Sequence, residues 1–171
     1  RWRTPKAVFV LDMAVGVRRT AAEQAAASLI VEAALDILQE DTYAATVAGL
    51  SYELLVTRRG YALTVEGFSH KLGSLALRIV GALTSIAAGA CTDAVYARCA
   101  QAVSLRLENA GHTAEERARQ IRLAALEAPH FSSDARLAAI SSDLDVQIVA
   151  ERAAAEICGP RIYLSGYANG N

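Results

Sequence analysis

One segment in the middle of the chain restricts the possible folds more than any other, because it predicts two strands joined by a tight reversal. Apolar residues alternate on both sides of the turn at residues 58–60 (Arg-Arg-Gly), which is the period of a half-buried strand. On the first strand, Tyr52, Leu54 and Val56 share one face. On the second strand, Tyr61, Leu63 and Val65 share one face. The sequence therefore predicts an antiparallel hairpin.

Helical signals lie on both sides of this hairpin. Before it, we predict an Ala-rich helix over residues 20–39 and a second, short helix over residues 41–48, each opened by side chains that cap helix N-termini. Gly49 would close the second helix in the left-handed conformation. After the hairpin, Ser69 stands where a helix can begin, and the apolar period changes from two to about 3.6. The stripe that results is Leu72, Leu75, Ile79, Leu83 and Ile86.

Four more helices follow, each predicted from a capping side chain ahead of apolar residues at helical spacing. The expected starts are Thr92, Thr113, Ser132 and Ser142. In the helix after Thr113, the inner face would be Ala114, Ala118, Ile121 and Ala125. A strand over residues 7–15 precedes all the helices, and a strand that includes Ile162 and Leu164 closes the chain. Asp12 in the first strand either pairs with an arginine or faces solvent, and we favour solvent.

The resulting order is β-α-α-β-β-α-α-α-α-α-β, with few strands among many helices. It predicts an α+β fold in which a small antiparallel-containing sheet of about four strands is covered on one face by helices. A chain of 171 residues can bury roughly 70% of the surface that it exposes when unfolded, so one core is enough. We expect residues 1–171 to form a single domain and, since they begin without an initiator methionine, to be part of a longer polypeptide.

Composition excludes several classes of protein. Hydrophobic residues make up 53% of the chain and charged residues 20%, which is too apolar for a disordered segment. A formal charge of −1 gives nucleic acid and anionic lipid no attraction. Arginines 117, 119 and 122 are accompanied by glutamates 115, 116 and 127, as on a solvated helix face. No apolar stretch is long enough to span a bilayer. We expect an intracellular, cytoplasmic protein whose cysteines are reduced and buried, namely Cys91, Cys99 and Cys158.

No cluster of side chains predicts catalysis. The histidines are His70, His112 and His130. No two of them are four residues apart, as zinc-binding histidines on one helix must be. The nearest approach to a metal site is His112 with Glu115 and Glu116, but Thr113 can cap a helix there, and we interpret these residues as an ordinary helix start. We therefore assign no catalytic and no metal-binding residues, and leave substrate contacts open. The serines beside glycines also lack the G-x-S-x-G elbow: Ser51, Ser69 and Ser165.

The order of these turn and strand residues resembles the pitrilysin and insulin-degrading-enzyme (insulysin) family of zinc metallopeptidases. The resemblance runs over nearly the whole chain, which makes it more specific than any one motif. The segments that carry it are Trp2–Ala7 (WRTPKA), Ala48–Tyr52 (AGLSY), the hairpin glycine Gly60, Val65–Leu72 (VEGFSHKL), Asn109, His130–Asp134 and Gly166–Asn171 (GYANGN).

The resemblance implies both a fold and a role. Members of this family hold four related α+β domains in one chain, and only the first binds zinc, through a His-x-x-Glu-His helix. This chain lacks that motif, so the resemblance implies a non-catalytic fragment of the third domain, inactive alone, that helps to enclose a peptide substrate. Its partners would be other domains of the same polypeptide and the parent's peptide substrate, and the parent could form a homodimer. No cofactor is expected in this fragment, and zinc is expected in the parent's catalytic domain.

A second interpretation stays open. Catalytically silent relatives, such as core subunits related to mitochondrial processing peptidase, keep this fold and lose the zinc helix. The chain would then be a free-standing interaction or assembly module. An upstream His-x-x-Glu-His in the same reading frame would favour the protease, and its absence would favour the module. An unrelated enzyme that uses its own glutamates and histidines is the least favoured alternative, because no cluster of them is focused.

Overall fold

The computed structural model describes residues 6–110, 113–159 and 162–169. Along the chain its elements are β1 (Lys6–Ala14), α1 (Ala21–Val47), β2 (Ser51–Val56), β3 (Gly60–Phe68), α2 (Ser69–Ala87), α3 (Asp93–Asn109), α4 (Ala114–Leu126), α5 (Ser133–Ser142), α6 (Val146–Ile157) and β4 (Tyr163–Asn169). The described residues thus form four strands and six helices. The predicted α+β class is confirmed.

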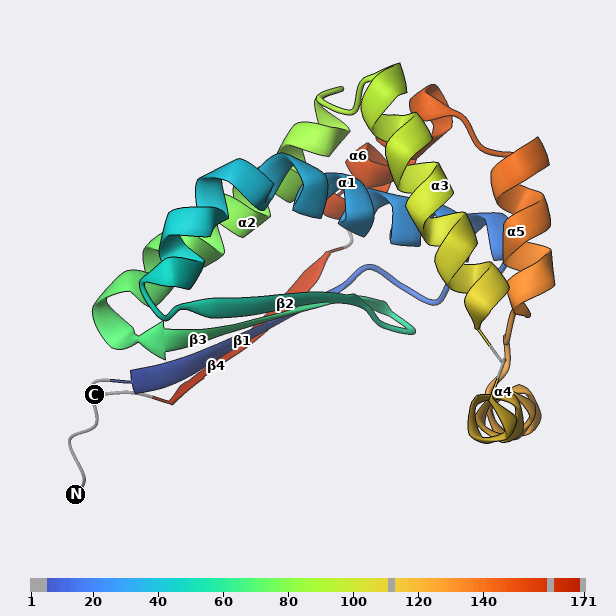
Figure 1. The fold of residues 1–171 in the computed structure, drawn as a ribbon, viewed down its shortest axis with the longest axis horizontal. Helices are drawn as coiled ribbons and strands as arrows, with labels where there is room; N and C mark the ends of the chain where they lie inside the picture. Colours follow the sequence, from blue (N-terminus) through green and yellow to red (C-terminus); the bar gives the residue numbers. More distant parts are fainter. Residues whose placement is uncertain (1–5, 111–112, 160–161, 170–171) are drawn as a thin grey trace.

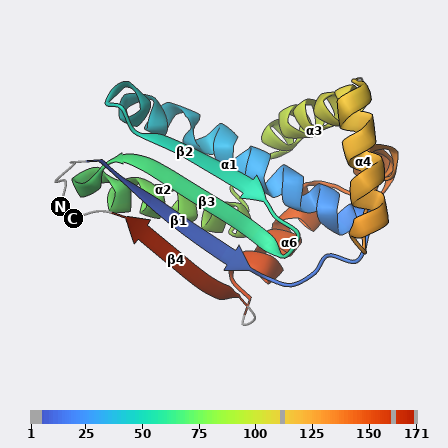
Figure 2. The ribbon, with the colours of Figure 1, turned by 90° about the horizontal axis from the view of Figure 1, so that it is seen from below.

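The four strands form one antiparallel sheet in the order β2-β3-β1-β4 (Figure 2). The predicted hairpin of β2 and β3 is present, and the residues expected on one face lie opposite one another, as Leu54 does to Leu63. β1 pairs with β3 on one side and with β4 on the other, and Val8 lies opposite Asn169. The beginning of β1 and the end of β4 therefore lie side by side at one end of the sheet.

Helices cover one face of this sheet, as predicted, and the core lies between the two layers (Figure 1). α1 and α2 pack on the strands and on each other, and α6 packs on both of these helices. α3 and α5 pack on α1, farther from the sheet. The predicted stripe of α2 is buried throughout: Leu72, Leu75, Ile79, Leu83 and Ile86. It faces a sheet whose buried side chains include Met13, Leu54, Leu63 and Val65.

α1 is longer than predicted, and the separation into two helices at residues 20–39 and 41–48 is wrong. The side chain of Thr42 does not cap a helix. Its hydroxyl donates to the Leu38 carbonyl oxygen at 2.8 Å and lies 3.0 Å from the Tyr52 hydroxyl. A threonine that bonds the preceding turn in this way is compatible with an uninterrupted helix. The left-handed helix end at Gly49 is confirmed by its φ of 79°.

The caps of two later helices also show where local signals fail. Ser142 was the predicted cap of the last helix, but it is the final residue of α5, and its hydroxyl donates to the Ala138 carbonyl. The N-cap of α6 is Asp145, whose carboxylate accepts the Ile148 N–H at 2.7 Å. Both residue types cap helices well, so the choice between them depends on where α5 ends.

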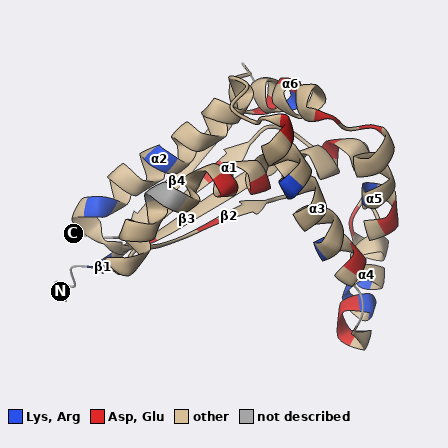
Figure 3. Cartoon of the chain, turned by 45° about the horizontal axis from the view of Figure 1, so that its top comes forward, with Lys and Arg blue, Asp and Glu red and all other residues tan. Residues whose placement is uncertain are grey.

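α4 stands away from the rest of the molecule (Figure 1). It begins after the predicted cap, but the apolar face expected to lie inward is not buried, and Ile121 is 66% exposed. Its acidic residues lie in the first turn and its arginines follow along the helix (Figure 3), and all of them are exposed, as predicted for a solvated helix face. Within the described ranges, no helix is long and apolar enough to cross a membrane.

The three cysteines differ in exposure. Cys91 and Cys99 are buried, whereas Cys158 is exposed at the C-cap of α6, so the prediction of three buried thiols is wrong for Cys158. Burial, with the charge of Asp36 adding to it, raises the pKa of the Cys99 thiol to about 11, and little of it is thiolate at neutral pH.

We expect iodoacetamide to label Cys158 in the folded chain and the other two cysteines only after unfolding, as measured by peptide mass spectrometry. Rapid labelling of Cys99 before unfolding would contradict this expectation.

Candidate functional site

The face of the sheet opposite the helices is not covered by any described residue (Figure 2). Residues directly opposite each other in neighbouring strands share a face, so the register identifies the side chains on this uncovered face. One row across the sheet is Leu55, Ala62, Asp12 and Ser165, and the next is Glu53, Thr64, Val10 and Tyr167. Ser51, Glu66 and Val8 continue the pattern. On the uncovered face, the side chains of β1 and β4 are thus mostly apolar or uncharged. The carboxylates on this face are those of Asp12, Glu53 and Glu66.

β4 forms one edge of the sheet and bears exposed aromatic rings. Tyr163 is 76% exposed and Tyr167 is 66% exposed, and both belong to the uncovered face. Within the described residues, β4 pairs only with β1, so the sheet leaves one row of its backbone N–H and C=O groups unpaired. Such an edge can add a further strand, and tyrosine rings provide a surface that is both apolar and able to form hydrogen bonds.

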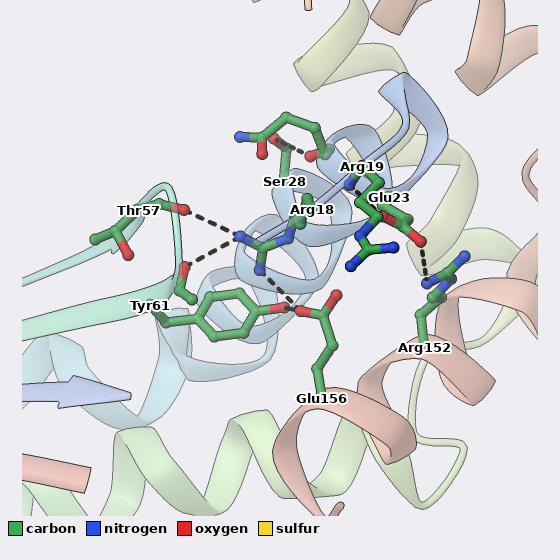
Figure 4. Close-up of polar contacts among 10 residues, drawn as sticks. Arg18, Arg19, Glu23, Ser28, Thr57, Tyr61, Arg152 and Glu156 are labelled. Carbon is green, nitrogen blue, oxygen red and sulfur yellow. Dashed lines mark hydrogen bonds and ion pairs between the residues drawn. The ribbon is translucent and has the colours of Figure 1, made fainter. Parts of the chain in front are cut away.

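A buried polar cluster ties the loop before α1 to the hairpin and to α6 (Figure 4). The side chain of Arg18 is 3% exposed, and its guanidinium donates to the Glu156 carboxylate at 2.8 Å and to the Thr57 carbonyl at 3.0 Å. The Tyr61 hydroxyl donates to the same oxygen of Glu156 at 2.6 Å. The guanidinium carbon of Arg18 also lies 5.0 Å from the centre of the Tyr61 ring. One carboxylate therefore joins three segments that are distant in sequence.

This cluster makes the stability of the fold depend on pH in the alkaline range. Burial, and then the negative charge of Glu156, raise the pKa of Tyr61 well above its ordinary value. The unfolded phenol ionises near pH 10 whereas the folded one keeps its proton, so above about pH 10 the unfolded state binds fewer protons and stability falls as pH rises. We expect the free energy of unfolding to fall by about 1.4 kcal/mol per pH unit in this range because of Tyr61.

Urea denaturation between about pH 9 and pH 11 measures this slope. Tyr61→Phe should remove the contribution of Tyr61, while Tyr167→Phe, which alters an exposed phenol, should leave the slope unchanged. Equal slopes in the two variants would contradict the assignment.

The candidate metal ligands lie only partly within the described residues. His70 lies in the first turn of α2, His130 lies half-buried before α5, and His112 is outside the described residues. Glu115 and Glu116 lie in the first turn of α4, as expected for a helix start. Among residues 6–110, 113–159 and 162–169, no three His, Cys, Asp or Glu side chains are placed to share a metal ion. We derive no zinc chemistry from the described residues.

The serines and Asp12 have no common site either. Ser51 and Ser165 lie on the uncovered face in the two edge strands, β2 and β4, and Ser69 begins α2. Asp12 is exposed on the uncovered face, which confirms the prediction that it faces solvent.

The residues that sequence reasoning missed are Arg18 and Glu156. Nothing in the sequence distinguishes Arg18 from its neighbour Arg19.

Comparison with known proteins identifies the family to which this chain belongs. Residues 1–139 match the family model described as the middle or third domain of peptidase M16. The chain belongs to the peptidase M16 family. The comparison with curated protein sequences gave no match. As a middle domain of an M16 peptidase, the chain implies other domains in the same polypeptide.

Solved structures agree with this M16 fold. The chain is similar to pitrilysin with a TM-score of 0.76 and 20% identity, over 95% of this chain and 17% of that one. It is also similar to a putative M16-like peptidase from Alicyclobacillus acidocaldarius, with a TM-score of 0.67, 13% identity and coverage of 95% and 40%. For a conserved protein from Enterococcus faecalis V583 the values are 0.68, 12%, 99% and 40%. The M16 chain thus spans at most 40% of the length of these structures.

Proposed function

We propose that this chain is a non-catalytic domain of a longer M16 zinc metalloendopeptidase, and that its uncovered sheet face forms part of the wall of the substrate chamber. The uncovered face is the observation that carries this proposal. Its central strand, β1, presents Val8 and Val10, both half-buried by their neighbours, to that side of the sheet. Because helices cover one side of this sheet, its other side contacts either solvent or a partner.

The chemistry of the uncovered face suits an extended peptide. Tyr167 and Val10 offer apolar contact in adjacent strands, and Thr64 beside them can donate or accept a hydrogen bond. The carboxylates of Glu53 and Glu66 flank this centre. Peptides with apolar and basic side chains would therefore be favoured over acidic ones. The zinc that performs hydrolysis would belong to another domain of the same polypeptide.

Site-specific photo-crosslinking in the full-length protein tests this role. We expect a benzophenone side chain at Thr64, on the uncovered face, to capture a bound peptide substrate. The same group at Leu77, which is 74% exposed on α2, should not capture it. Capture at Leu77 but not at Thr64 would overturn the proposed orientation of the domain.

A second test concerns the isolated chain. We expect the 171 residues alone to hydrolyse no peptide, with or without added zinc. Hydrolysis that a chelator abolishes, or tight one-to-one zinc binding that disappears in His112→Ala, would overturn the non-catalytic assignment. The reading frame upstream decides between a protease and a catalytically silent assembly module, since only the protease requires a His-x-x-Glu-His motif there.

A further inference from the structure

A cavity of about 460 Å³ lies between the hairpin turn, the start of α1, α4 and the loop before α5. A volume of this order is typical of sites that hold small molecules. Its lining contains four arginines, which are Arg18, Arg58, Arg119 and Arg136, and one carboxylate, Glu127. Cationic side chains from four different parts of the chain thus surround one space.

Two of these arginines already have partners. Arg18 is ion-paired with Glu156, and the guanidinium of Arg58 donates to the Ala128 carbonyl oxygen. Arg119 and Arg136 differ, because neither forms an ion pair within the described part of the chain. Although Glu127 lines the same cavity, it does not neutralise either of them by direct contact.

Arg136 is the less usual of the two, because part of its guanidinium is buried without a partner. Its Nε and that of Arg18 are the two buried side-chain donors without a hydrogen-bond partner among the described residues, and both arginines line this cavity. Burial also lowers the pKa of Arg136, since it removes water from a charge that nothing compensates. The Arg136 side chain is half-buried, its Nε has no hydrogen-bond partner, and a bound anion would compensate the loss of water around its charge.

We propose that this cavity binds a small oxyanion, a carboxylate or a phosphate group, held by the guanidinium groups of Arg119 and Arg136. A guanidinium presents parallel N–H donors that match either group, and two of them arriving from different helices would hold it from two sides. The hydroxyl of Ser133 and the ring of His130 line the same space and can add hydrogen bonds. This inference is independent of the role proposed for the uncovered face.

Titration of the 171-residue chain with inorganic phosphate and, separately, with succinate tests the proposal at constant low ionic strength. We expect at least one of the two anions to bind saturably in calorimetry and to raise the thermal unfolding midpoint, whereas sodium chloride should do neither. Arg136→Gln and Arg119→Gln should each weaken binding about tenfold. Arg122→Gln removes the same charge from α4 but not from the cavity lining, and should change affinity by less than about twofold.

The outcomes separate the possible ligands. Binding of phosphate alone would identify a phosphate site, and binding of succinate alone a carboxylate site. The proposal is overturned if neither anion binds up to about 10 mM, or if Arg119→Gln and Arg122→Gln bind equally well. Because Arg119 is exposed, Arg119→Gln keeps the test decisive even if circular dichroism shows that Arg136→Gln does not fold.

Discussion

Replacing Glu156 with alanine should destabilise the folded chain by about 3–5 kcal/mol. The change leaves the guanidinium of Arg18, whose side chain is only 3% exposed, without its counter-charge. It also removes the acceptor of the Tyr61 hydroxyl, which is buried with it. Breaking one member of a buried pair costs more than the pair itself contributes, because the remaining charge stays desolvated.

A surface ion pair provides the matched control for Glu156→Ala. Asp36 accepts from Arg98 at 2.7 Å, a distance close to that between Arg18 and Glu156, but the Arg98 side chain is 60% exposed. Water replaces the lost contact there, and Asp36→Ala should cost no more than about 1 kcal/mol. Chemical denaturation of both variants measures the two effects. Similar losses would show that the burial of Arg18 does not govern the energetics of the cluster.

Gly60→Ala should cost at least about 3 kcal/mol. A Cβ atom added at Gly60 would lie 1.8 Å from the carbonyl oxygen of Met13 and 2.9 Å from its carbonyl carbon. Both are backbone atoms of the neighbouring strand β1, so no side chain can rotate away to make room. The pairing of β1 with β3 would have to open at this end, beside the Arg18 cluster, which also bonds the Gly60 carbonyl.

Gly81→Ala is the corresponding control, because the same methyl group is added where nothing lies within 4 Å. Gly81 lies within α2, where alanine is the better helix former, and the substitution should stabilise the chain by about 0.5–1 kcal/mol. Thermal or urea unfolding of the two variants should therefore give effects of opposite sign. Destabilisation by both would point to a general intolerance of substitution instead of the close approach at Gly60.

Signals within a few residues of one another predicted much of the fold. The caps at Thr20, Thr92, Thr113 and Ser132 each accept a backbone N–H three residues on, and each opens a helix where the sequence places one. The hairpin and the stripe of α2 also depend on nearby residues alone. Periodicity and capping are local properties, and a single sequence displays them directly.

What the sequence could not predict depends on distant contacts. Arg18 and Arg19 are neighbours, yet Arg18 is buried and Arg19 is exposed, because Glu156 reaches Arg18 across 138 positions of sequence. The arginines of α4 were interpreted as a solvated face, and nothing near Arg119 indicates that Arg136 of another helix lines the same cavity. These placements follow from how the helices pack, which one sequence does not reveal.

The pairing of the first strand with the last has a consequence for any larger assembly. Since Val8 lies opposite Asn169, a polypeptide that arrives at β1 and departs from β4 is attached to this unit at a single corner. Covalent links to neighbouring modules at that corner would not pass through the hairpin or through the helices above the sheet. Both the uncovered sheet face and the outer side of the helix layer are thus available for contact with other parts of such an assembly.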